Sequence, residues 1–488
     1  QKFYDIVVQV AIIRPGPIVG NMVHPYLKRR QGREPVTYAH PCLEPILGRT
    51  LGVPLFQEQL LKVAMECASF TGGEAEELRR AFGFKRSEAR MKAIEVKLRQ
   101  GLQSNGITGK TQDDIVLAIS SFALYGFPES HAASFALIAY ASAYLKCNYL
   151  AAFTAAILNN QPMGFYQPFT LIKDAQRHGL KVLPIDITCS DWLCTMEEAG
   201  EAGTGTRSIR GTRSGENTAS PGASVPVSSS PASARLALRL GLKYVKGLSQ
   251  QSGQAIVRER AVREFSGIDD LRNRVPELRK DELRKLAAVG ALNFIQAPAV
   301  VKTKRKKAKA TRATPVNRRD ALWQVERVTR DAGELYESLL EKDGNSPLQQ
   351  MSLTERVDAD FRGTGLTIGK HPVAYHRGEL NRLKALRAID IRKLRNGTFV
   401  RVAGWVIVRQ RPGTAKGFMF LSLEDETGVS NIIVTPQLFE KYRLELVGHP
   451  FLLIEGALQN QDNVISVKAS HVEPLSLAVA AAPSHDFH

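Results

Sequence analysis

The chain has 488 residues, enough for several domains, and 43% of them are hydrophobic, so it can form cores of ordinary size. A formal net charge of +18 and a pI near 9.7 predict a polyanionic partner, nucleic acid before membrane. A basic protein with solvated lysines has the same composition. No segment reaches the roughly 18 apolar residues that a membrane-spanning helix needs, which excludes that class.

The cysteines are few and have no C-x-x-C spacing; they stand at positions 42, 67, 147, 189 and 194. They predict neither a zinc site nor a disulfide framework, and they fit a reducing cytoplasm. The chain opens inside an apolar run without an initiator Met or a signal peptide. We therefore expect a cytoplasmic protein, and we expect this chain to be a fragment.

Residues 1–195 are predicted to be mostly helical. The run from Arg14 to Pro17 must form a turn, because neither of its prolines fits a helix interior. A basic cluster that contains Lys28 and Arg30 either serves solubility or contacts nucleic-acid phosphates. Gln57 opens an amphipathic helix whose polar start is free to face a substrate.

A helix is predicted from about Glu74 to a glycine stop at Gly83. Its acidic residues come first and its basic residues last, as the helix dipole favours. The basic residues around the stop are either a dipole-matched surface or a site for a polyphosphate. These candidates are Arg79, Arg80, Lys85 and Arg86.

The stretch from Phe122 to Leu145 has a helical apolar period after a Tyr-Gly-Phe-Pro break. Ser130 and His131 lie at the start of this helix, where Ser130 is expected to act as the N-cap and free N–H groups favour an anion. The alternative is an ordinary cap next to a surface histidine.

Two segments are not expected to fold. Residues 199–234 are dominated by Gly, Ser, Thr, Ala and Pro, and they cannot bury enough apolar surface to offset ordering entropy. Residues 302–312 contain seven Lys or Arg, a charge run that repels itself. The first is interpreted as a disordered insertion and the second as a basic linker, with nonspecific DNA tethering as the alternative.

A helix-hairpin-helix is predicted around Lys246 and Gly247, followed by a helix over 254–263. The glycine turn of this motif exposes backbone N–H groups to a DNA phosphate. A second helical pair, 268–274 and 280–288, makes the motif tandem. The DNA-binding candidates here are Lys246, Gly247, Arg258 and Arg260.

From Gly397 to about Pro474 the apolar period switches to two, which predicts five strands with a helix over 436–444. This is the layout of an OB-fold, whose strand faces hold single-stranded nucleic acid. Trp405 lies either on that surface or in the barrel core. The surface candidates are Arg401, Trp405, Arg409, Arg411, Lys416 and Phe418.

Four motifs of the first 145 residues, taken in order, resemble those of the bacterial C-family DNA polymerases, the relatives of the polymerase III alpha subunit. The motifs are R-P-G-P at 14–17, F-Q-E-Q at 56–59, L-R-R-A-F-G at 78–83 and Y-G-F-P-E-S-H-A-A-S-F-A at 125–136. The stretches 158–166 and 190–194 and the C-terminal residues are similar to the error-prone branch. No clamp-binding peptide of the replicative type is found, which favours the same branch.

The resemblance implies the C-terminal part of an error-prone polymerase acting in translesion synthesis and DNA repair. It implies fingers that face a deoxynucleoside triphosphate, binding of primer–template DNA, single-stranded DNA at the OB-fold, and a partner protein of a mutagenesis complex. Mg²⁺ is expected on palm aspartates upstream, so no catalytic or metal-binding residue is assigned in this chain. The nucleotide-facing set is Arg14, Gln57, Arg79, Arg80, Lys85, Arg86, Ser130 and His131.

The expected fold class is multidomain α+β, with mostly helical fingers, tandem helix-hairpin-helix motifs and a C-terminal OB-fold barrel. The expected domains are 1–195 fingers, 196–235 insertion, 236–296 helix-hairpin-helix region, 297–318 basic linker, 319–396 helical connector, 397–474 OB-fold and 475–488 tail. The alternative function is a stand-alone, non-catalytic DNA-binding module. An RNA-binding protein built on the barrel is a third reading, which leaves the four motifs unexplained.

Overall fold

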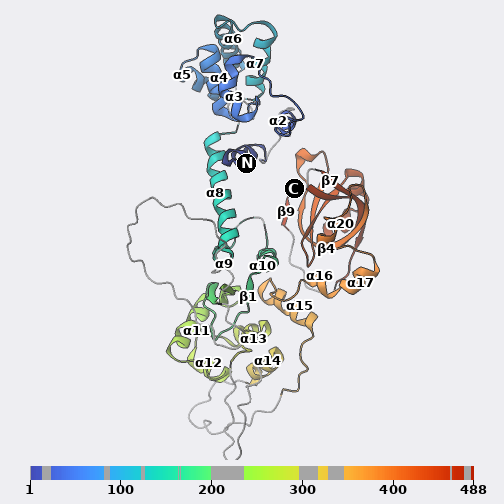
Figure 1. Cartoon of the computed structure of the whole chain (residues 1–488). Helices are drawn as coiled ribbons and strands as arrows, with labels where there is room; N and C mark the ends of the chain where they lie inside the picture. The colour runs from blue at the N-terminus through green and yellow to red at the C-terminus, as the bar shows by residue number, and fades with distance from the viewer. Residues whose placement is uncertain are drawn as a thin grey trace, which may run out of the picture. The chain divides into compact units, whose positions relative to one another are not determined.

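The structure is a computed structural model that describes residues 2–13, 23–81, 88–122, 127–162, 164, 166–198, 236–295, 317–327, 346–461, 464–477 and 485–487. The chain divides into two compact units, Gln1–Tyr144 and Leu145–His488 (Figure 1). Most of the predicted insertion and basic linker lies outside the described residues. So do the candidate site residues Arg14, Lys85 and Arg86.

The first unit is helical. Its elements are α1 (Phe3–Ile12), α2 (Val23–Arg30), η1 (Pro41–Leu43), α3 (Glu44–Leu47), η2 (Gly48–Thr50), α4 (Gln57–Ala68), α5 (Gly72–Ala81), α6 (Glu88–Ser104), α7 (Gly109–Phe122) and most of α8 (Glu129–Asn148). The predicted helix at Gln57 is confirmed: α4 buries Leu60, Val63, Ala64 and Cys67 on one side, the spacing of an amphipathic helix.

Cys42 of η1 and Cys67 of α4 form a disulfide, which the sequence did not lead us to expect. Their Cα atoms are 6.2 Å apart, a normal separation for such a bond. The two cysteines are 25 residues apart in the chain, and only the packing of η1 against α4 brings them together. Spacing along the sequence therefore carried no signal for this bond.

The second unit begins with a helical region. Its elements are α9 (Leu150–Asn159), α10 (Pro168–Arg177), β1 (Lys181–Leu183), β2 (Thr195–Glu198), β3 (Leu236–Arg239), η4 (Leu242–Tyr244), α11 (Gln250–Val262), α12 (Ile268–Arg274), α13 (Lys280–Val289), α14 (Arg318–Arg327), α15 (Leu353–Thr364), α16 (Pro372–Tyr375), α17 (Arg377–Arg382) and α18 (Ala388–Ile391). The three strands form one sheet in the order β1-β3-β2. The residues on either side of the predicted insertion therefore pair with each other.

Asp358 and Asp360 lie on α15, within the segment expected to be a helical connector. Ser352 accepts the Glu355 N–H at the start of this helix, and the Glu355 carboxylate accepts the Ser352 N–H. This reciprocal capping box starts the helix, and Gly365, with φ +78°, ends it.

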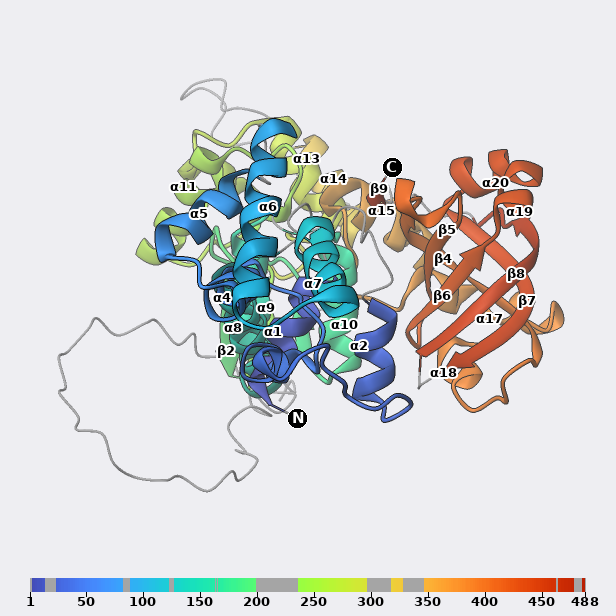
Figure 2. The same cartoon turned by 90° about the horizontal axis from the view of Figure 1, so that it is seen from above.

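The C-terminal part of the second unit is a closed barrel (Figure 2). Its elements are β4 (Phe399–Gln410), η6 (Gly413–Ala415), β5 (Met419–Glu424), β6 (Val429–Val434), α19 (Pro436–Lys441), α20 (Arg443–Gly448), β7 (Phe451–Gln461), β8 (Val464–Pro474) and β9 (His485–Phe487). Five strands follow in the order β5-β6-β8-β7-β4, and a β4–β5 pairing closes the ring. The predicted α+β class and OB-fold layout are confirmed.

One hydrophobic core runs through the helical region of the second unit and into the barrel. It joins Phe169 of α10 and Phe361 of α15 to Trp405 and Phe451 of the barrel. The barrel is thus fixed to α10 and α15 by buried aromatic rings. None of the helices in the described part of the chain combines the length and the apolarity of a membrane span.

Candidate nucleotide and nucleic-acid interfaces

The starts of α4 and α8 lie side by side in the first unit. The Gln57 N–H donates to the Phe127 carbonyl over 3.1 Å. The Glu58 carboxylate accepts the N–H of Glu129, the first residue of α8, over 2.8 Å. The structure therefore brings Gln57 close to the first turn of α8, which contains Ser130 and His131.

Ser130 does not cap α8, which corrects the sequence prediction. The helix begins at Glu129, and the Glu58 carboxylate takes the capping position at its first N–H. His131 is exposed, and its ring lies 4.6 Å from that of Phe135. Because a carboxylate already occupies this helix start, it is a poorer site for a phosphate than the sequence suggested.

Arg79 and Arg80 lie in the last turn of α5, and both pair with Glu76, at 2.7 and 3.0 Å. Hydrogen bonds from Arg79 and then Arg80 lower the pKa of Glu76 to about 2. The hydrogen bond to Glu76, and the more distant charge of Glu58, raise the pKa of Arg79. The arginine side chains are 45% and 75% exposed, so a polyphosphate that reaches them competes with Glu76.

Two further candidate cations lie on α2. Lys28 is exposed to solvent. Arg30 is about half exposed and pairs with Asp5 of α1 at 2.7 Å. The ion pair reduces the positive charge that Arg30 offers to a phosphate.

Lys246 and Gly247 form an exposed turn between η4 and α11, where Gly247 has φ +77°, a conformation that favours glycine. The Lys246 N–H donates to the Gly363 carbonyl of α15 over 2.7 Å. The Ser249 N–H donates to the Glu282 carboxylate over 2.8 Å. The prediction that this turn offers its N–H groups to a phosphate is therefore wrong for Lys246 and Ser249, although the Lys246 side chain still lies at the surface.

The two candidate arginines of α11 differ. Arg260 is 13% exposed, donates to the Ile187 carbonyl over 2.8 Å and pairs with Asp191. Its expected DNA contact is wrong, because its donors tie α11 to the segment before β2. Arg258 is 59% exposed and pairs with Glu277 at 3.0 Å, so it remains a surface candidate.

Trp405 lies in the core and not on the barrel surface. It is 2% exposed, and its ring centroid lies 5.1 to 5.3 Å from those of Phe169, Phe361 and Phe451. A ring enclosed in this way has no face on which a base can stack. The surface prediction for Trp405 is wrong, and the core alternative is confirmed.

Arg409 was predicted on the barrel surface, and this prediction is wrong. It is 7% exposed, and it donates to the carbonyls of Leu446 and His449 at the end of α20, over 2.7 and 2.6 Å. It therefore joins α20 to β4 and is enclosed by the fold. Arg401 is 41% exposed and pairs with a β7 carboxylate at 2.7 Å, while Lys416 is exposed on the turn before β5.

Phe420 is a surface aromatic that the sequence prediction missed. It is 38% exposed on β5, between the buried Met419 and Leu421. The period-two alternation of buried and exposed residues could have identified it. Arg411 and Lys416 lie on the loop before β5, so adjoining segments carry an exposed ring and two cations. Arg411 itself lies over the Phe439 ring and pairs with Glu440.

A buried charged group joins the barrel to α10. Glu424 of β5 pairs with Arg177 at 2.8 Å, and the His371 ring lies 3.9 Å from its second oxygen. Burial, offset in part by Arg177, raises the pKa of Glu424 to about 7. Burial also lowers the pKa of His371 well below 6.5. These groups are enclosed at a junction between elements, and we assign them no catalytic role.

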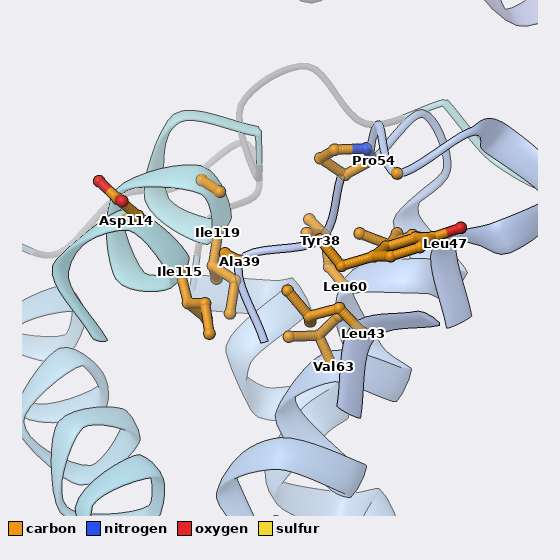
Figure 3. A pocket seen from close by; sticks show the side chains of 12 residues that line it. Tyr38, Ala39, Leu43, Leu47, Pro54, Leu60, Val63, Asp114, Ile115 and Ile119 are labelled. Atoms are coloured by element: carbon orange, nitrogen blue, oxygen red, sulfur yellow. The ribbon is translucent and has the colours of Figure 1, made fainter. Parts of the chain in front are cut away.

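The first unit also contains an apolar pocket of about 130 Å³ between η1, α4 and α7 (Figure 3). Leu60, Val63, Ile115 and Ile119 line it, and Asp114 supplies a carboxylate. This volume holds an apolar group the size of one side chain. With one carboxylate and no cation in its lining, the pocket does not fit a nucleotide.

The described residues contain no group of three or more His, Cys, Asp or Glu side chains that could hold a metal ion. Transfer of a nucleotidyl group by two metal ions requires such carboxylates.

Three family models match parts of the chain. Residues 1–106 match the finger domain of the bacterial DNA polymerase III alpha subunit, 179–299 a helix-hairpin-helix motif, and 400–475 an OB-fold nucleic acid binding domain. The matched regions define a nucleic-acid-binding chain that begins with polymerase fingers.

Curated relatives match over the whole chain. The error-prone DNA polymerase of Anaeromyxobacter sp. (strain K) is 42% identical, and the match covers 100% of this chain and 39% of that protein. Error-prone DNA polymerase 2 of Agrobacterium fabrum is 39% identical, with 100% and 41% covered. The enzyme of Bordetella bronchiseptica is 40% identical, with 100% and 42% covered.

The whole chain is similar to part of the error-prone DNA polymerases, and its first 106 residues match the finger domain of the bacterial DNA polymerase III alpha subunit, which confirms the resemblance found in its motifs. It spans only 39% to 42% of the length of the curated relatives described above. The activity of a whole polymerase is therefore a separate question from the identity of this part.

Proposed function

We propose that the chain is part of an error-prone DNA-directed DNA polymerase that acts in damage-induced translesion synthesis and DNA repair. The observation that carries this proposal is the match of the whole chain, at 42% identity, to a protein of that name. The chain supplies fingers that face a deoxynucleoside triphosphate and domains that bind primer–template DNA. A protein of a mutagenesis complex recruits the enzyme, which works in the cytoplasm.

Mg²⁺ supplies the charge stabilisation of nucleotidyl transfer in such an enzyme. We place its carboxylate ligands in the part of the parent that lies outside this chain, since the described residues hold no suitable group. The role of this chain is to bind and orient. Arg79 and Arg80 are proposed to contact the triphosphate, exchanging their bonds to Glu76 for bonds to phosphate oxygens.

The second candidate function is a stand-alone DNA-binding module. It is favoured by the same lack of a metal site among the described residues, and by helix-hairpin-helix and OB-fold regions that need no active site. The two functions make one different prediction: only a polymerase function requires the full-length parent to extend a primer.

The test is binding and extension on one primer–template. Binding of this chain, measured by fluorescence anisotropy, is expected to weaken steeply with salt, because the DNA phosphates release counterions. The full-length parent with Mg²⁺ and four nucleotides is expected to extend the primer, while this chain alone is not. Extension by this chain would contradict our placing of the metal site, and a parent that binds without extending would support the module.

A second prediction concerns the barrel surface. Replacing Phe420 with alanine is expected to weaken single-stranded DNA binding by about 1–3 kcal/mol, the effect of losing one stacked base. Phe399→Ala is the matched control. Phe399 is 63% exposed at the start of β4, whereas Phe420 pairs with Gln410 at the other end of that strand. Equal losses in the two variants, in an anisotropy titration with oligothymidine, would show that the site is not local to β5.

A further inference from the structure

The disulfide between Cys42 and Cys67 joins two segments of the first unit that pack in one core. Cys42 belongs to η1 and is partly exposed, while Cys67 belongs to α4 and is 1% exposed. Leu43, beside Cys42, and Val63, one turn before Cys67, both line the apolar pocket (Figure 3). The bond therefore connects two segments that form the wall of this pocket.

The segment 41–50 is attached to α4 at a second point. The Gln59 side chain, 4% exposed near the start of α4, donates to the Thr50 hydroxyl over 2.9 Å and to the Ile46 carbonyl over 3.3 Å. Cys67 lies in the last turn of the same helix. The disulfide and the hydrogen bonds of Gln59 therefore hold this segment at the two ends of α4.

Gln59 also connects this segment to the start of α4. Its side-chain oxygen accepts the N–H groups of Leu55 and Phe56, over 2.9 and 3.1 Å. The same helix start contacts α8 through the two hydrogen bonds described above. A change in how the segment 41–50 is held therefore acts on residues that are bonded to this helix start.

The other three cysteines differ from this pair. All five cysteines lie among the described residues, and Cys147, Cys189 and Cys194 are free. Burial raises the pKa of the Cys189 thiol to about 12 and that of Cys194 to about 11. Because the thiolate is the reactive form, these two react slowly with oxidants. Cys147 is exposed on α8 and has no bonded partner.

The compartment proposed above makes the bond between Cys42 and Cys67 conditional. Cytosolic thiols are kept reduced, and the disulfides that form there are usually transient or redox-sensing. Thiol–disulfide exchange also needs a sulfur that an attacking thiolate can reach. The partly exposed Cys42 offers such a sulfur, whereas Cys67 is enclosed.

We propose that Cys42 and Cys67 are a site of reversible thiol oxidation, which attaches the η1 end of the segment 41–50 to α4 when oxidised and releases it when reduced. The proposal rests on the proposed function for its reducing compartment. In the oxidation, the Cys42 thiolate attacks one sulfur of a small-molecule disulfide such as oxidised glutathione and displaces a thiolate. The Cys67 thiolate then attacks the Cys42 sulfur and displaces the second one. Two protein thiols thus lose two electrons and two protons, and the oxidant becomes two thiols.

Mass spectrometry and hydrogen exchange on this chain test the proposal, in glutathione buffers of rising oxidised fraction. After alkylation and digestion, mass spectrometry is expected to find the link between Cys42 and Cys67 in oxidising buffer and to lose it in reducing buffer, with the chain folded in both. The digest also separates this link from glutathione adducts at the exposed Cys147.

Amide protons of the segment 41–50 are expected to exchange about tenfold more slowly in the oxidised chain, because the bond restricts local opening. Cys42→Ser is expected to abolish this difference between buffers. Cys67→Ala is a second variant with the same expectation, since alanine leaves no polar group in the buried position. Cys147→Ser, on α8, is the matched control and is expected to keep the difference.

Three results would overturn the proposal. The first is a folded chain in which the link between Cys42 and Cys67 never forms. The second is a link that opens only when the chain is unfolded, which would make it a permanent structural bond. The third is equal exchange of the segment 41–50 in the two buffers. None of these measurements involves DNA or a nucleotide, so a parent that does not extend primers contradicts only the proposed function.

Discussion

Replacing Trp405 with alanine is expected to lower the free energy of unfolding by about 3–5 kcal/mol, the usual cost of removing a fully buried tryptophan. The ring packs against Phe169 of α10, Phe361 of α15 and Phe451 of β7. Its removal leaves a cavity where the barrel meets the helical region. The loss therefore weakens both the barrel and its attachment to α10 and α15.

Calorimetry of the whole chain measures the loss of stability. Single-stranded DNA binding, measured at a temperature where the variant is still folded, then shows whether the substitution also affects binding directly. Trp405→Phe is expected to lose less stability, since it keeps part of the aromatic packing. Phe420→Ala is expected to show the opposite profile, with weakened binding and little loss of stability, because Phe420 is 38% exposed. A Trp405→Ala variant that is as stable as the native chain but binds DNA poorly would contradict the core position of Trp405 and support a role on the DNA-binding surface.

The sequence predicted the barrel well, because strands such as β5 and β6 alternate residues of higher and lower exposure along much of their length. In β5, Met419, Leu421 and Leu423 are buried while Phe420 is exposed. The same logic failed at Trp405, which lies where two buried surfaces meet. Strand alternation says which face a residue is on, but not whether a second layer covers that face.

The misplaced polar residues have a common physical cause, since each is satisfied by a partner distant in sequence. Glu58 reaches across 71 residues to the start of α8 and takes the capping role expected of Ser130. Arg409 donates to a carbonyl 37 residues away, and Arg260 to one 73 residues away. A local pattern identifies an arginine as basic, but only the fold decides whether its donors are already used.

The capping of α15 is a different case, because its signal was local. Ser352 and Glu355 have the spacing of a capping box. The box indicates a helix at Leu353, within the segment expected to be a helical connector. This part of the fold was predictable from the sequence, in contrast to the site residues.

Replacing Glu282 with alanine is expected to be the second large loss, of about 3 kcal/mol in the free energy of unfolding. Its carboxylate is buried and accepts the N–H groups of Ser249 and Arg279, over 2.8 and 3.0 Å, and the Ser252 hydroxyl over 2.9 Å. Without it, these three donors lose their acceptor. Because Ser249 belongs to the turn beside Gly247, the loss is also expected to weaken DNA binding by the helix-hairpin-helix region.

The stabilisation by Glu282 is expected to decrease at low pH, because the surroundings of its carboxyl group lower its pKa. Burial alone raises the pKa of this carboxyl, but hydrogen bonds from Arg279, Ser249 and Ser252 lower it overall below its ordinary value of 4.5. A folded-state pKa below the unfolded value gives stability that is complete above about 4.5 and is lost as the pH falls through the folded-state pKa. The stability difference between the native chain and Glu282→Gln, measured by thermal unfolding, should therefore shrink as the pH falls below 4.5. A native–variant difference that stays constant with pH would contradict an ionised, hydrogen-bonded carboxylate at this site.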